Sequence, residues 1–562
     1  MARRVLTLVV LLLGVLIPAA GAHAAVPATA APQQDVAIPL IPESKSAFRP
    51  PGFSVTVGQA LALAKQTPTM QSLHRSEHPL IYAVFYMPGS HYEVDFWYRG
   101  KATAGVMITP SGRVGVIYRG PLVLGLYARG NYSPTFDNPW VWVPFGLAFL
   151  LPILLLRGLA WLDRLDLGVV LAFGVSYTLF NTQIFEPGVW LAYPPLLYLF
   201  GRMLWRGLRA RPRARELRIA LPTGVLIAGL LVLIGARIAV ALAPNQIMDV
   251  GYASMIGAYK ILHGQSIYFP SVGHPDTYGP VNYLAYAPFE ALWPVKSWAG
   301  FVPGARIAVL TFDLITIGGL VQIGRRLLSG RAGLRLGLVL AWLWAACPFT
   351  VLPLIKSSND GLVAMFMVLV LLAMASPVKR GVLLGLAAAA KFSPAILLPL
   401  IAVGPGAADR GPMRRALAAF VVAAGASVAL FLPPGGLKEM WQHTLGFQLS
   451  RPDIFSPWAL HPGLAPVKDV VELAVIALAF FVAVRPRGPR SQAQVSALAA
   501  ALTIGVQLPA LHWFYLYIDW FMPLVLIAVL GGPVRAALAP PAVPARAPVL
   551  DIDPEPELAG AL

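Results

Sequence analysis

Apolar runs long enough to cross a bilayer recur along most of this 562-residue chain. Hydrophobic residues make up 57% of the sequence and charged residues only 12%, which is unlike a soluble globular domain. A membrane helix needs about 20 mainly apolar residues, and the stretch 219–243 meets that length. The sequence therefore predicts an all-α polytopic membrane protein with about eleven spanning helices.

The excess of positive charge, 43 Lys and Arg against 25 Asp and Glu, gathers in short clusters between the apolar runs. Such clusters mark the cytoplasmic loops of a membrane protein, so the charge indicates orientation. The positive charge does not indicate nucleic-acid binding, because the sequence has no soluble basic face that could bind it. This orientation places the Pro/Ala-rich tail, residues 534–562, in the cytoplasm. The clusters lie at 202–218, 325–335, 410–415 and 485–490.

The N-terminus, residues 1–24, has the pattern of a secretory signal. Two arginines precede an apolar stretch that is short for a spanning helix, and Ala-His-Ala before Ala25 gives a small-residue cleavage site. Residues 25–138 are then expected outside the cytoplasm, as a Pro/Ala-rich tether and a small α+β domain. Its expected elements are a helix at 57–65 and strands at 81–86, 92–98, 105–108 and 114–118.

Two polar stretches are expected on the outer face of the membrane part. Residues 139–210 should form the first membrane helices and residues 219–533 a membrane core. Because the cluster at 202–218 lies inside, the run 219–243 crosses outward. The polar stretches 244–305 and 433–466 then face outside.

The run 381–404 does not fit a simple alternation of inside and outside, because basic clusters flank both of its ends. It carries Lys391 and Pro394 near its middle. We therefore expect a broken helix or a re-entrant pair of half-helices, which is tolerated at membrane depth where it lines a protein cavity.

The first outer stretch combines a carboxylate with several tyrosines. Asp249, Tyr252 and Tyr259 fall at i, i+3 and i+10, on one face of an expected helix that stops at His263-Gly264. A carboxylate and two phenols at a membrane surface suit a hydroxyl-rich substrate. An interfacial helix with an aromatic belt and a capping Asp explains the same pattern equally well.

Three basic residues are candidates for holding an anion. Lys391 is flanked by apolar sequence. Because an ionisable side chain is costly to place within the membrane, such a residue is first considered a candidate for a functional role. Arg237 lies near the outer end of its apolar run, where snorkelling to the interface is the alternative. Arg451 lies in the second outer stretch with His443 and Gln448, which is equally well a solvated loop.

Short motifs over roughly Ile219–Leu530 carry a family resemblance. Lys391-Phe392-Ser393-Pro394 has the form of a Lys-x-x-Pro helix break, and Asn359-Asp360-Gly361 stands at an expected helix start. With the first outer stretch, these motifs resemble family 87 glycosyltransferases, whose usual Gly-Gln before the Asn is absent here, as is an acidic pair beside Asp249. The outer-stretch residues that carry the resemblance are Asp249, Tyr259, Gly264, Tyr268 and Tyr278-Gly279-Pro280.

The resemblance implies a GT-C-class enzyme of the plasma membrane that takes a hexose, usually mannose, from a polyprenyl-phosphate donor. The acceptor would be an envelope glycan or glycolipid on the outer face. Such a transfer needs a base for the acceptor hydroxyl and a cation for the leaving phosphate. We expect Asp249 as the base and Lys391, with Arg237 or Arg451, as the clamp. Further substrate-contacting candidates are Tyr252, Tyr259, Tyr268, Tyr278, Asn359, Asp360, His443 and Gln448.

Other functional classes leave weaker signals. No Walker loop, His/Cys metal spacing or Ser-elbow motif appears, so no cofactor is evident. A divalent metal stays an open alternative that no motif supports, and the one cysteine is Cys347. A transporter or flippase of lipid-linked precursors would also use broken helices and an intramembrane lysine. Against it stand the lack of an internal repeat and the outward placement of the longest polar stretches. A noncatalytic assembly protein, anchored by its membrane part, is a third alternative.

Overall fold

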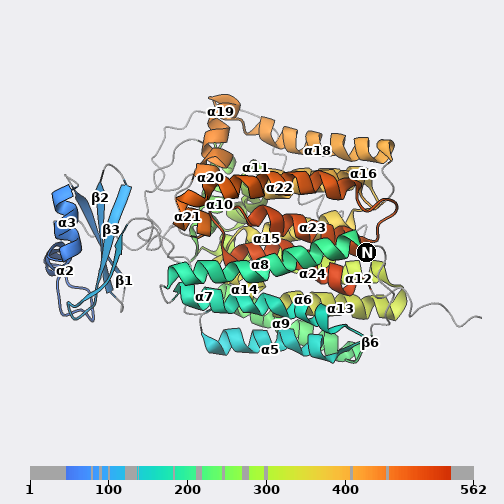
Figure 1. Ribbon diagram of the computed structural model, residues 1–562, viewed down its shortest axis with the longest axis horizontal. Coiled ribbons are helices and arrows are strands. Elements are labelled where there is room, and N and C mark those ends of the chain that lie inside the picture. Colours follow the sequence, from blue (N-terminus) through green and yellow to red (C-terminus); the bar gives the residue numbers. More distant parts are fainter. Residues whose placement is uncertain are drawn as a thin grey trace, which may run out of the picture.

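The structure is a computed structural model that is mostly helical, with a small four-stranded sheet at one end of a helical bundle (Figure 1). A second, two-stranded sheet pairs β5 (Leu156–Arg157) with β6 (Arg218–Ile219) in antiparallel orientation. The expected signal segment and the C-terminal tail lie outside the residues that it describes. It describes residues 46–532 without 77–79, 88–90, 99–100, 120–135, 137, 182–183, 210–217, 244–246, 269–276, 296–301, 406–408 and 451–454.

The N-terminal sheet has the elements that the sequence predicts, in the order β1-β2-β3-β4 with every pair antiparallel. Alternate residues of β2, Tyr92, Val94 and Phe96, are buried in a core shared with the preceding helices. A second helix, α3, was not predicted. The elements are α2 (Val57–Lys65), α3 (Pro68–Ser76), β1 (Ile81–Met87), β2 (His91–Tyr98), β3 (Lys101–Ile108) and β4 (Val114–Arg119).

The remaining chain forms the bundle. Large apolar side chains are exposed on helices at its edges, such as Val232 at 72% and Leu430 at 77%, as expected of lipid-facing surfaces. Its helices are α5 (Pro139–Leu155), α6 (Trp161–Gly168), α7 (Phe173–Asn181), α8 (Phe185–Leu208), α9 (Thr223–Leu242), α10 (Asp249–Leu262), α11 (Pro280–Leu292), α12 (Pro303–Leu327), α13 (Gly330–Ala346), α14 (Pro348–Lys356), α15 (Asp360–Leu372), α16 (Pro377–Ala390), α17 (Leu398–Val403), α18 (Arg410–Leu430), α19 (Gly436–Trp441), α20 (Phe447–Ser450), α21 (Pro457–Leu460), α22 (Ala465–Val484), α23 (Gln492–Gln507) and α24 (Ile518–Leu530).

Within the described residues, three helices are by themselves long and apolar enough to cross a membrane: α9, α12 and α18. Helices α13 and α14, which meet at a 59° bend, would together make a fourth. Other apolar helices, α5 and α15 among them, are shorter. The chain therefore has membrane-spanning helices, and the count of about eleven stays a prediction.

The break that the sequence predicts within 381–404 is present. Helix α16 ends at Ala390, Lys391 is extended with φ −138° and ψ 134°, and a 3-10 helix, η4 (Ser393–Leu397), follows. Pro394 explains the break, because it has no N–H to give and its ring would clash with the carbonyl of Ala390. A second break separates α14 from α15, where Ser357 takes a left-handed conformation with φ +52°.

The two polar stretches that were expected on one face lie at the same end of the bundle. Helices α10, α19, α20 and α21 gather at the end that faces the small sheet (Figure 1). Met440 of α19 is buried with Ile267, Tyr268 and Tyr283 of the first stretch. The two stretches therefore pack against each other.

Candidate functional site

The two helix breaks bring Lys391 and Asp360 into an ion pair. Lys391 Nζ contacts Asp360 Oδ1, and the side chains are 12% and 1% exposed. Two further donors hold the carboxylate: Trp520 Nε1, 2.8 Å from Oδ1, and the hydroxyl of Ser358 at Oδ2. Asp360 is also the first residue of α15, where the helix dipole favours a negative charge. The carboxylate is thus held by three donors, and the lysine is the more exposed member of the pair.

Aromatic rings surround the ammonium group of Lys391. Its Nζ lies 5.0 Å from the ring centre of Trp520 and 5.5 Å from those of Tyr278 and Tyr517. Rings at this distance attract a cation through their negative faces. A lysine ammonium has three N–H donors, so the bond to Asp360 leaves the group able to bind an anion as well.

The Tyr278-Gly279-Pro280 turn places Tyr278 at this cluster. The amide N–H of Gly279 donates to the carbonyl of Ala390, the last residue of α16, over 3.2 Å. A Cβ at position 279 would lie 2.0 Å from the carbonyl oxygen of Ala389. Only glycine allows this approach, and Pro280 then starts α11. The turn therefore fixes the first outer stretch directly onto the helix break at Lys391.

Helix α10 begins at Asp249 and rests on the other break. The N–H of Met248 donates to the carbonyl of Lys356 over 2.9 Å. A Cβ at Gly251 would lie 2.6 Å from the carbonyl oxygen of Ser357, so the two backbones are in close contact. The backbone of Asp249 is thus anchored beside the segment that leads into Asp360. The side chain of Asp249 lies outside the part of the chain that the structure describes.

The predicted tyrosines differ in their surroundings. Tyr252 and Tyr268 are buried, and the hydroxyl of Tyr268 donates to the carbonyl of Tyr278 over 2.9 Å. Tyr259 stacks on His263 with ring centres 3.9 Å apart. Tyr268 therefore supports the turn that carries Tyr278, and Tyr278 contacts Lys391.

The predicted phosphate role of Arg237 is not supported. Its guanidinium is 1% exposed and forms a two-pronged ion pair with Asp313, with N–O distances of 2.6 and 2.9 Å. Its remaining N–H groups donate to Ala345 and Thr350. All five donors of the arginine are therefore used inside the protein, and none is left for a phosphate. The apolar helix α9 contains this arginine because its side chain is buried against the Asp313 carboxylate, and not because it extends to the membrane interface.

The other predicted residues lie elsewhere or cannot be placed. Asn359 is buried, and its amide N–H donates to Asn282 of α11. His443 lies on the turn that joins α19 to α20, and Gln448 lies within α20; both are half-buried. Arg451 is outside the described residues. No local sequence pattern points to Trp520 or Tyr517, because their contacts with the lysine depend on packing between segments far apart in the chain.

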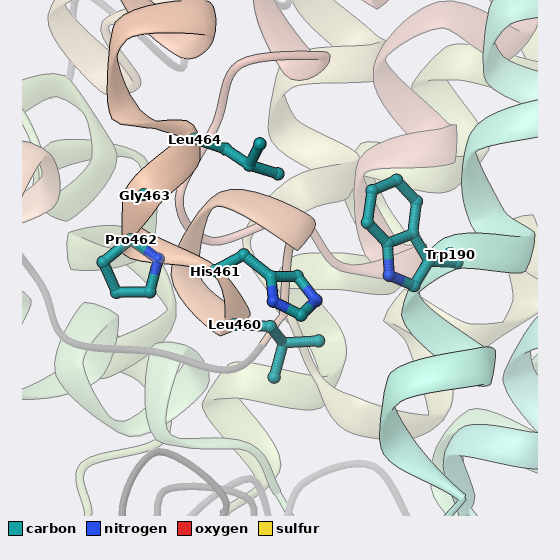
Figure 2. Close-up of a pocket in the computed structure, with 6 residues that line it drawn as sticks. All are labelled: Trp190, Leu460, His461, Pro462, Gly463 and Leu464. Atoms are coloured by element: carbon teal, nitrogen blue, oxygen red, sulfur yellow. The ribbon is translucent and has the colours of Figure 1, made fainter.

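A separate open pocket of about 640 Å³ lies between α8 and the segment after α21, and Figure 2 shows its six lining residues. His461 at its rim pairs with Glu186, Nε2 to Oε1, over 3.1 Å. No member of the Lys391 cluster lines it, so we do not assign it to the candidate site. Nor does any group of three or more potential metal ligands gather among the described residues. The lining residues are Trp190, Leu460, His461, Pro462, Gly463 and Leu464.

Comparison with known proteins gives a match to the family model of glycosyltransferase family 87 over residues 277–511. The matched segment contains Tyr278, Asp360 and Lys391 but begins after Asp249. A search of curated proteins finds no match.

Among solved structures, the crystal structure of ArnT from Cupriavidus metallidurans bound to undecaprenyl phosphate is similar, with 18% identity and a TM-score of 0.34. The alignment covers 55% of this chain and 59% of that one, so the chain spans less than two thirds of that protein. A similarity this loose carries no argument of its own. Residues 277–511 of this chain are thus similar to glycosyltransferase family 87.

Proposed function

We propose that this protein transfers a hexose from a polyprenyl-phosphate donor to an envelope glycan or glycolipid on the outer face of the plasma membrane. The family resemblance suggests mannose as the sugar. The observation that carries the proposal is the Lys391 cluster, in which a partly exposed ammonium is held at a helix break by Asp360 and three aromatic rings.

The cluster suits the leaving phosphate of such a donor. Breaking the sugar–phosphate bond leaves negative charge on the phosphate, and a fixed cation in a poorly solvated site stabilises that charge. Before the donor binds, Asp360 holds the ammonium of Lys391 in place and neutralises its charge, so that no unpaired charge is buried. The aromatic rings exclude water from one side of the ammonium and offer apolar faces to a lipid-linked sugar.

Asp249 is the proposed base for the acceptor. The acceptor hydroxyl oxygen attacks the anomeric carbon while the bond from that carbon to the phosphate oxygen breaks. The electron pair of the broken bond stays on the phosphate, the hydroxyl proton passes to the carboxylate, and the anomeric configuration inverts. The support for this role is that α10 begins at Asp249 and is anchored beside Ser357, three residues before Asp360.

The first test is transfer itself. Purified protein in detergent, given polyprenyl-phosphate-mannose labelled in the sugar and a lipoglycan acceptor, is expected to move label into the acceptor. The broken helices would also suit a transporter of lipid-linked precursors. Such a transporter moves the donor across the membrane of proteoliposomes and leaves the acceptor unlabelled. Label that crosses the membrane without entering the acceptor would replace the proposal with that alternative.

The proposed orientation gives a second prediction. Reporter fusions after Arg215, Gly273 and Arg490 are expected to read inside, outside and inside, because basic clusters flank the first and last positions. Paired alkaline phosphatase and fluorescent-protein reporters measure this directly. An outside signal after Arg215 would put α10 on the cytoplasmic face and remove the proposed outer-face chemistry.

A further inference from the structure

Three buried polar side chains, from α10, α11 and the residue that precedes α15, form a hydrogen-bond chain close to the proposed site. The amide of Asn359 donates from Nδ2 to Asn282 Oδ1 over 2.9 Å. Asn282 Nδ2 donates in turn to Ser254 Oγ over 3.0 Å, and Ser254 Oγ donates to the carbonyl of Val250 over 2.7 Å. The chain therefore runs in one direction, from the start of α15 through α11 to the first turn of α10.

The bonds in this chain depend on one another. Buried amide groups are almost always hydrogen-bonded, because an unpaired one loses its interaction with water and gains nothing in return. Asn282 uses its carbonyl for Asn359 and its N–H for Ser254, so a shift of any one helix breaks at least one bond. Networks of this kind favour a single relative placement of the elements that they join.

The chain ends where the backbone contacts of α10 begin. Val250 follows Asp249 directly, and Met248 and Gly251 contact Lys356 and Ser357. The start of α10 is thus held to one short segment, residues 356–359, both by backbone contacts and by the side-chain hydrogen bonds. That segment leads into Asp360, the partner of Lys391.

We infer that Ser254 and Asn282 are positioning residues for sugar transfer, which set α10, and with it Asp249, relative to the Lys391–Asp360 pair. This inference rests on the proposed function. The bonds that Ser254 and Asn282 make in this hydrogen-bond chain do not include Lys391, so both residues act through the position of α10. A displacement of about 1 Å between reacting groups costs on the order of 10²-fold in rate, so small changes in this chain should appear in kcat.

The test compares Asn282→Ala and Ser254→Ala with Ser496→Ala. Ser496 is a matched control because both serines are 0% exposed and each donates to the carbonyl four residues earlier, Ser496 on α23. We expect kcat to fall about 10–100-fold in the two site variants, with KM for the donor changed less than about twofold. The control is expected to keep both values.

Hydrogen exchange over residues 248–262 gives a readout that does not need activity. The amides of this segment should exchange faster in Asn282→Ala than in the wild type and should be unchanged in Ser496→Ala. If exchange changes but the wild-type protein transfers no sugar, the proposed function fails and the positioning of α10 stands. If exchange and kcat in Asn282→Ala match the control, or if KM for the donor rises as kcat falls, the positioning role is wrong.

Discussion

Replacing Asp249 with asparagine is expected to abolish sugar transfer while the protein remains folded. Asparagine has the shape of aspartate but cannot accept the proton of the acceptor hydroxyl. General bases contribute about 10²–10⁴-fold to a rate, so the loss should reach that range. Initial rates with the labelled donor measure the effect, and a detergent melting curve establishes that the fold is kept.

Asp469→Asn is the matched control for this change. The same Asp-to-Asn change is made there at an exposed position. The carboxylate of Asp469, at the start of α22, is paired with Lys468 over 3.1 Å. Surface ion pairs contribute about 0–1 kcal/mol, so this variant should keep both its melting temperature and its rate. Donor binding should also survive in Asp249→Asn, since the proposed phosphate contact belongs to Lys391. A rate near that of the wild type in Asp249→Asn would remove the base assignment and leave the donor site untouched.

Local sequence patterns were enough to predict most elements of the N-terminal domain, although β3 begins at Lys101, four residues before the expected strand, and α3 was not predicted. Alternation and turn residues located the strands of the N-terminal sheet, and the pair Lys391 and Pro394 located the break after α16. These features depend on backbone chemistry within a few residues, as with the missing N–H of proline. Chain length and apolarity likewise predicted helices, whereas the number that cross the membrane depends on bends and short segments.

The contacts of the site could not be predicted in the same way, because they join residues far apart in the chain. Trp520 donates to Asp360 across 160 positions, and no local pattern relates the two. Arg237 resembled a snorkelling side chain, since its own helix gives no sign that Asp313 of α12 faces it. Which side of a helix meets protein and which meets lipid is set by packing between helices, so the partner of a buried charge is a tertiary property.

Lys391→Met is expected to destabilise the protein as well as to weaken donor binding. The substitution leaves the carboxylate of Asp360, which is 1% exposed, without its cation. Removing one partner of a buried pair costs about 3–5 kcal/mol, because the remaining charge is uncompensated. The bonds from Trp520 and Ser358 offset part of that cost. Melting in detergent measures the loss, and Lys379→Met, at an exposed position on the same helix, should melt like the wild type.

The double variant Lys391→Met/Asp360→Asn separates the structural role of the lysine from its proposed role in binding. Neutralising Asp360 removes the uncompensated charge, so the melting temperature should recover most of the way to that of the wild type. Donor binding and transfer should stay lost, because no ammonium is present to meet the phosphate. Asp360→Asn alone tests the reverse case, in which the cation remains without its carboxylate. If the double variant regains both stability and transfer, the pair only maintains the fold, and the donor phosphate must be held by other residues.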